Sequence, residues 1–80
     1  MGKIDKIYAK LMAAKSDNSF SFDEIGYLLS KLGFQSKQTG SHISFRKGAA
    51  YANLQSQKGK AKGYQVAQVR EELKKHQIEP

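Results

Sequence analysis

The spacing of apolar residues changes at Gly33, and this change constrains the fold more than any other feature of the sequence. Before it, in residues 3–15 and 20–32, apolar residues recur every three or four positions, as they do along one face of a helix. After it, in residues 34–55, they alternate with polar residues, as in a strand with one buried face. The helical spacing returns in residues 64–77. The predicted order is therefore helix, helix, three strands, helix.

The second predicted helix has signals at both ends. Ser21 and Glu24 have the S-x-x-E spacing of a capping box, and Phe20 and Ile25 occupy the positions of a hydrophobic staple. Gly33 follows the last apolar position and predicts a left-handed end to the helix.

The alternating region divides into segments 34–38, 41–46 and 49–55, separated by the turn sequences Thr39-Gly40 and Lys47-Gly48. Three such segments predict an antiparallel meander. Helices that cover one face of an antiparallel sheet make an α+β fold, which we expect here.

In the middle segment, alternation places Ile43 and Phe45 towards the helices and His42, Ser44 and Arg46 on the other face. An imidazole, a hydroxyl and a guanidinium in one row suit the binding of a phosphate and proton transfer beside it. The third segment adds Tyr51, Asn53 and Gln55 to this face.

Charge is distributed unevenly along the chain. The net charge is +7, and all seven carboxylates lie outside residues 25–70, which carry eight lysines and arginines. Such a segment favours a polyanionic partner, either nucleic acid or an acidic protein surface, although a basic excess also serves solubility alone. Within it, residues 58–63 read K-G-K-A-K-G and predict a mobile cationic loop that either contacts phosphates or is a solvated connector.

Several classes of site are not expected. The chain has no cysteine, which excludes disulfides and cysteine-bound zinc and suits the cytoplasm. No apolar run approaches the roughly 20 residues that span a bilayer, and the N-terminus does not resemble a signal peptide. His42 and His76 lie too far apart in sequence to predict a metal site, and His76 is expected at the surface near a helix end. The 80 residues predict a single domain, 1–80.

Three segments together resemble the HicA family, the small toxins of bacterial toxin–antitoxin pairs. They are S-F-D-E-I-G-Y-L-L-S-K-L-G-F, G-S-H-I-S-F and Y-Q-V-A-Q-V-R-E-E-L-K-K-H. The resemblance covers residues 20–77, so residues 1–15 are an additional N-terminal helix. Its most specific parts are Leu32-Gly33-Phe34, Gly40-Ser41-His42, Phe45 and Tyr64-Gln65-Val66.

This resemblance implies a fold like that of a double-stranded-RNA-binding domain, with a three-stranded meander and helices packed on one face. It implies cleavage of mRNA without a ribosome, with His42 as the catalytic residue. The implied partner is a HicB-type antitoxin that covers this histidine. Some relatives carry further His-Pro residues in or after the third strand, where this chain has N-L-Q-S-Q at 53–57.

The residues agree with such a chemistry. RNA carries its own nucleophile, the 2′-hydroxyl, and His42 would act as general base or acid without a metal. Gly40, in the turn before the middle segment, would let the backbone approach closely and direct the strand. The candidate RNA contacts are Ser44, Arg46, Lys47, Tyr51, Lys58, Lys60 and Lys62.

Two alternatives remain open from the sequence. One is an RNA-binding module of similar shape that does not cleave, and the other is a basic domain that binds only protein. A His42→Ala variant that loses cleavage but keeps binding would separate the nuclease from the first alternative.

Overall fold

The computed structural model describes residues 2–13 and 20–80. In chain order the elements are α1 (Lys3–Ala13), α2 (Phe22–Lys31), β1 (Gln35–Thr39), β2 (His42–Lys47), β3 (Ala50–Gln57), β4 (Lys60–Ala61) and α3 (Gly63–Lys75). The predicted order of helices and strands is confirmed, with one short strand added before α3. Positions 14 and 15 of the first predicted helix lie outside the described residues.

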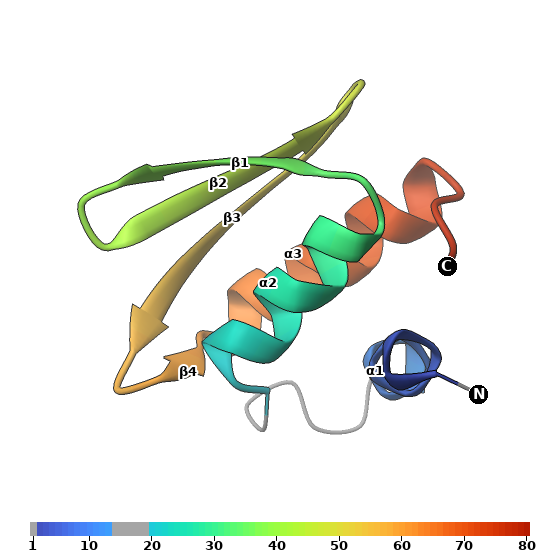
Figure 1. The fold of residues 1–80 in the computed structure, drawn as a ribbon, viewed down its shortest axis with the longest axis horizontal. Coiled ribbons are helices and arrows are strands. Elements are labelled where there is room, and N and C mark those ends of the chain that lie inside the picture. Colours follow the sequence, from blue (N-terminus) through green and yellow to red (C-terminus); the bar gives the residue numbers. More distant parts are fainter. Residues whose placement is uncertain (1, 14–19) are drawn as a thin grey trace.

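The four strands form one antiparallel sheet in the order β1-β2-β3-β4. Helices α2 and α3 lie on one side of this sheet, and α1 packs against them on their far side (Figure 1). The other side of β1, β2 and β3 is left uncovered, and we call it the open face. The α+β arrangement predicted from the sequence is therefore present.

The first turn of α2 is built by the predicted capping box. The Glu24 N–H donates to Ser21 Oγ at 3.0 Å, and the Ser21 N–H donates to Glu24 Oε1 at 3.2 Å. Because Ser21 is the N-cap, the helix begins at Phe22 rather than at residue 20. At its other end Gly33 has φ = 97°, the left-handed conformation that was predicted.

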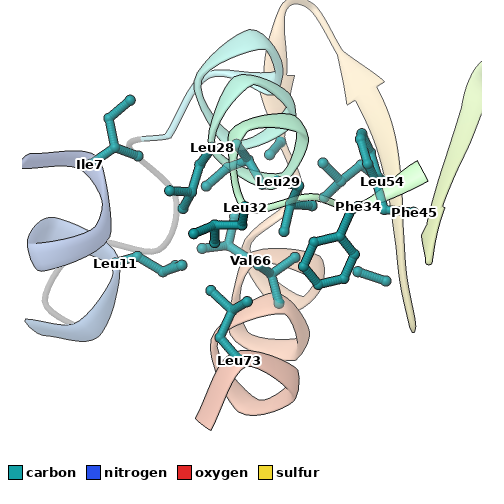
Figure 2. Packing of buried hydrophobic residues seen from close by; sticks show 14 of the residues in the cluster. Ile7, Leu11, Leu28, Leu29, Leu32, Phe34, Phe45, Leu54, Val66 and Leu73 are labelled. Carbon is teal, nitrogen blue, oxygen red and sulfur yellow. The ribbon is translucent and has the colours of Figure 1, made fainter. Parts of the chain in front are cut away.

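The hydrophobic core lies between the helices and the covered face of the sheet. In Figure 2, Ile7 and Leu11 of α1 point towards the side chains of α2 and α3, so α1 closes the core opposite the sheet. Phe45 of β2 is also buried, and a Cβ at Gly26 of α2 would lie 3.7 Å from its Cζ atom. The apolar stripes predicted for the helices are thus the core. Its fully buried members include Leu11, Ile25, Leu28, Leu29, Leu54, Val66 and Val69.

The prediction of a loop at residues 58–63 was wrong, because these residues include the strand β4 and the first residue of α3. Strand β3 continues to Gln57 and pairs with β4, so that Ser56 lies opposite Ala61 and Gln57 opposite Lys60. The sheet consequently has four strands rather than the three that were predicted.

The reason for this hairpin is partly local and partly long-range. Lys58 and Gly59 have φ values of 54° and 81°, the two left-handed residues of the tight turn that favours strand pairing. The hairpin is also tied to the start of α2, because the Ala61 N–H donates to the Phe20 carbonyl at 3.1 Å and the Phe22 N–H to the Gly59 carbonyl at 3.0 Å. These two backbone hydrogen bonds join segments that are distant in sequence, so no local sequence pattern predicts them.

Within the described ranges, no helix has both the length and the apolar character needed to cross a membrane.

Candidate functional site

The open face carries three rows of polar side chains. The strand register confirms the predicted alternation: Ile43 lies opposite Leu54, and Phe45 opposite Ala52, on the covered face. The remaining positions of the three strands alternate to the open face. Its nine residues are Gln35, Lys37 and Thr39 of β1, His42, Ser44 and Arg46 of β2, and Tyr51, Asn53 and Gln55 of β3. None of them is a carboxylate, so the face suits an anionic partner.

His42 is the first residue of β2 and is exposed. It follows the two-residue turn Gly40-Ser41, in which Gly40 has φ = 62°, as the first central residue of a tight hairpin turn requires. Thr39 and Gln55 are its partners on the neighbouring strands. Among residues 2–13 and 20–80, no hydrogen bond or ion pair involves the imidazole. Both ring nitrogens are consequently available to a ligand.

Arg46 and Tyr51 lie at the other end of the open face. They are directly opposite each other on β2 and β3, and Arg46 Cζ is 5.1 Å from the centre of the Tyr51 ring, a cation–π contact. Arg46 lies four positions beyond His42 on β2, or about 13 Å away at roughly 3.3 Å per residue. The sequence placed Arg46 correctly on the face of His42, but these two side chains do not converge on one phosphate.

Ser44 lies between these two ends. Its hydroxyl donates to the Lys37 carbonyl at 3.3 Å, across the β1–β2 pair. The hydroxyl proton of Ser44 is therefore engaged in a hydrogen bond within the sheet, and only its oxygen remains free to accept a hydrogen bond from a ligand.

Lys47 is separated from the other candidate contacts. It lies opposite Ala50, on the covered side of the sheet by alternation, and its Nζ donates to the Leu32 carbonyl at 2.6 Å. Leu32 is the C-cap of α2, so this ammonium stabilises the negative end of the helix. The structure thus assigns Lys47 a role in the fold, where the sequence suggested a phosphate contact.

The lysines of residues 58–62 surround a hollow beside the β3–β4 hairpin. This hollow has a volume of about 640 Å³, and its lining residues are Gln57, Lys58, Lys60, Ala61, Lys62, Gly63 and Tyr64. Tyr64 is 61% exposed, and Lys62 Nζ is 6.0 Å from the centre of its ring. Tyr64 was named from the sequence as part of the resemblance to the HicA family, and not as a candidate contact. The lysine-rich segment immediately before it was the signal that could have marked it as a surface group.

The hairpin lysines lie at the same end of the sheet as His42. Figure 1 shows the β1–β2 turn and the β3–β4 turn together at this end, with the β2–β3 turn at the opposite one. The register agrees, because His42 lies opposite Gln55, two residues before the end of β3 at Gln57. Lys37 is closer to His42 along the sheet, because it lies two residues from Thr39, the β1 partner of His42. The hairpin adds Lys58 and Lys60 at the same end of the sheet but farther from the imidazole, a relationship that the sequence did not predict.

His76 is remote from this arrangement. It is the C-cap of α3, half-buried, and its Nε2 lies 3.6 Å from Glu72 Oε1 one turn earlier. This position near a helix end agrees with the sequence analysis. The described part of the chain contains no group of three or more His, Cys, Asp or Glu residues that could hold a metal ion.

Comparisons with protein-family models, with curated proteins and with solved structures find no match for this chain.

Proposed function

We propose that this protein is a metal-independent endoribonuclease of the HicA type, a toxin that cleaves mRNA without a ribosome in the cytoplasm. The observation that carries the proposal is the exposed imidazole of His42 at the end of the sheet where the lysine-rich hairpin lies. A proton-transfer group at the same end of the sheet as several cations suits the cleavage of a phosphodiester. The α+β sheet with helices on one face is consistent with the double-stranded-RNA-binding-domain-like fold that the resemblance implies.

The reaction would proceed through the 2′-hydroxyl of the RNA. His42 removes the proton of this hydroxyl, its oxygen attacks the adjacent phosphorus, and the bond from phosphorus to the 5′-oxygen breaks. The products are a 2′,3′-cyclic phosphate and a 5′-hydroxyl, and the leaving oxygen takes a proton from solvent or from the imidazolium. An imidazole can serve in both transfers, and such acid–base catalysis typically contributes about 10²–10⁴-fold in rate.

The hairpin supplies the positive charge for this step. Lys58, Lys60 and Lys62 line the hollow next to the His42 end, and their ammonium groups would stabilise the negative charge that builds on the phosphate oxygens. Lysines bind phosphate as point charges and do not require the fixed geometry of a bidentate arginine.

The implied protein partner is a HicB-type antitoxin. Residues 25–70 carry eight basic residues and no carboxylate, so an acidic protein surface would complement the charge around His42. A partner bound there would cover the imidazole and stop cleavage.

A non-catalytic RNA-binding module is the second candidate. The observation that favours it is that no carboxylate is in contact with the His42 imidazole in the described residues, whereas many catalytic histidines are oriented by such a group. Both candidates use the same basic surface, so only catalysis distinguishes them.

The test is cleavage of a labelled RNA in EDTA by the purified protein, by His42→Ala and by His76→Ala. His76→Ala is a matched control, because it removes the other histidine of the chain, the C-cap of α3. We expect cleavage by the parent and by His76→Ala, and none by His42→Ala. Equal cleavage by all three proteins would reject His42 as the catalytic residue. Binding without cleavage by the parent would favour the non-catalytic module.

A further inference from the structure

The contact between Arg46 and Tyr51 has no role in the proposed cleavage step. Tyr51 is 42% exposed, and the guanidinium of Arg46 lies over its ring, with 5.1 Å between Cζ and the ring centre. Together they present a flat cationic and aromatic surface about 13 Å from His42, since Arg46 lies four positions along β2 at roughly 3.3 Å per position. Such a surface is suited to stacking against a nucleobase.

The open face is also hollowed over β1 and β2, on the side of Arg46 away from Tyr51. A depression of about 280 Å³ is lined by Gln35, Ser36, Lys37, Ser44 and Arg46. Lys37 and Arg46 provide two positive charges, and Gln35 and Ser44 provide neutral hydrogen-bonding groups. This combination fits the phosphate and sugar of a nucleotide that lies across the sheet.

The shape of the face favours a single strand over a duplex. The bases of a duplex are stacked on one another, and the deep, narrow major groove of A-form RNA keeps their edges from side chains. A sheet with an exposed aromatic side chain instead contacts bases that have been splayed out of a stack. None of the nine strand residues of the open face is a carboxylate that would repel the backbone of such a strand. The nearest carboxylates to the pair are Glu71 and Glu72 of α3, which line a hollow with Tyr51 at the β3 edge.

We propose that the substrate is single-stranded RNA laid along β2 on the open face, with one base stacked on the Arg46–Tyr51 pair and the cleaved phosphate at His42. This inference rests on the proposed function and adds a substrate class and a base-binding subsite to it. At about 3.4 Å per nucleotide in a stacked strand, the subsite lies up to four nucleotides from the cut, and fewer in an extended strand.

Binding measurements at constant salt test the subsite. All variants carry His42→Ala so that the RNA stays intact, and they are titrated with a fluorescent single-stranded RNA and with a hairpin duplex of the same length. Tyr51→Ala should weaken single-strand binding roughly 5- to 150-fold, the range expected for the loss of one stacked base. Tyr51→Phe should bind within about twofold of the parent, because it keeps the ring.

The matched control is Tyr27→Ala. Tyr27 is 39% exposed and also lies under a cation, with Lys31 Nζ 5.7 Å from its ring centre, but it belongs to α2. We expect Tyr27→Ala to leave single-strand affinity unchanged. Equal affinities for Tyr51→Ala and Tyr27→Ala, or tighter binding of the duplex than of the single strand, would overturn the inference.

Cleavage mapping separates this inference from the proposed function. In the chain with His42 intact, Tyr51→Ala should still cut RNA but lose any preference for a base at one constant distance from the cut. If cleavage requires His42 but Tyr51→Ala cuts the RNA at the same positions as the parent, the subsite is rejected and the proposed function stands. A parent protein that neither binds nor cleaves RNA would reject both.

Discussion

Gln65 Oε1 accepts a hydrogen bond from the Gln55 backbone N–H at 2.8 Å. Gln65 is only 5% exposed, although it lies in the first turn of α3. Two turns later, Glu72 Oε1 accepts from the Tyr51 N–H at 3.0 Å. Helix α3 thereby satisfies backbone donors along the edge of β3 that is not paired with β2. An edge covered in this way is closed to pairing with another chain.

Replacing Gln65 should therefore destabilise the protein. Gln65→Leu leaves the Gln55 N–H without its acceptor, and we expect the free energy of unfolding to fall by about 1–3 kcal/mol. Urea denaturation measures this change. Gln68→Leu, the same substitution at an exposed position of α3, is the control and should change stability by less than roughly 0.5 kcal/mol. Similar losses in both variants would show that the hydrogen bond contributes little.

The capping box makes a second contribution to stability. Ser21→Ala removes the oxygen that accepts from the Glu24 N–H, and we expect a loss of about 1 kcal/mol in urea denaturation. Ser30→Ala, at an exposed position inside α2, removes a hydroxyl that caps nothing and should be neutral or slightly stabilising. A loss in Ser30→Ala as large as that in Ser21→Ala would contradict the capping role.

A substitution in the turn of the β3–β4 hairpin should change stability and RNA affinity in opposite directions. Lys58 has φ = 54°, which asparagine adopts more readily than lysine, so Lys58→Asn should stabilise the protein by up to about 1 kcal/mol. It should also weaken RNA binding, because an ammonium is lost. Thermal unfolding and RNA titration of the same variant check the two effects. Lower thermal stability would mean that Lys58 has favourable contacts that asparagine does not replace.

The hairpin lysines should set much of the salt dependence of RNA binding. In the His42→Ala background, changing Lys58, Lys60 and Lys62 together to Gln should reduce the slope of log K against log salt by up to about 2, at roughly 0.7 per lost phosphate contact. The control changes Lys3, Lys6 and Lys10 of α1 to Gln and alters the net charge equally. Equal slopes in the two triple variants would show that only the overall charge matters.

Tyr8 should make stability depend on alkaline pH. Burial raises the pKa of its phenol above the ordinary value of 10.0, and the nearby carboxylate of Glu79 raises it further. Above about pH 10 the unfolded chain loses this proton more readily than the folded chain, so stability falls as pH rises through this range. Between about pH 9 and pH 11, the unfolding free energy of the parent should therefore fall relative to that of Tyr8→Phe. A difference independent of pH would contradict the raised pKa.

The sequence by itself determined the features that depend on neighbouring residues. The capping box of Ser21 and Glu24 joins groups three positions apart, and the left-handed Gly33 ends the same helix. Both features could therefore be predicted from a few neighbouring residues. The placement of His42 and Arg46 on one face follows from the two-residue period of a strand, which holds whatever the partner strand is. These local rules were enough to predict the order of the elements apart from β4, and the polar composition of the open face.

Only the tertiary structure decided which of these groups lie together. The β3–β4 hairpin depends on hydrogen bonds from Phe22 and Ala61 to segments far away in sequence, and it brings the lysines to the His42 end. Lys47 follows Arg46 directly, yet its ammonium reaches the Leu32 carbonyl and serves the fold. Strand alternation assigns a residue to a face but contains no information on register, on the far end of a helix or on a loop that folds back. Those are set by packing between distant segments, and this packing pairs Arg46 with Tyr51.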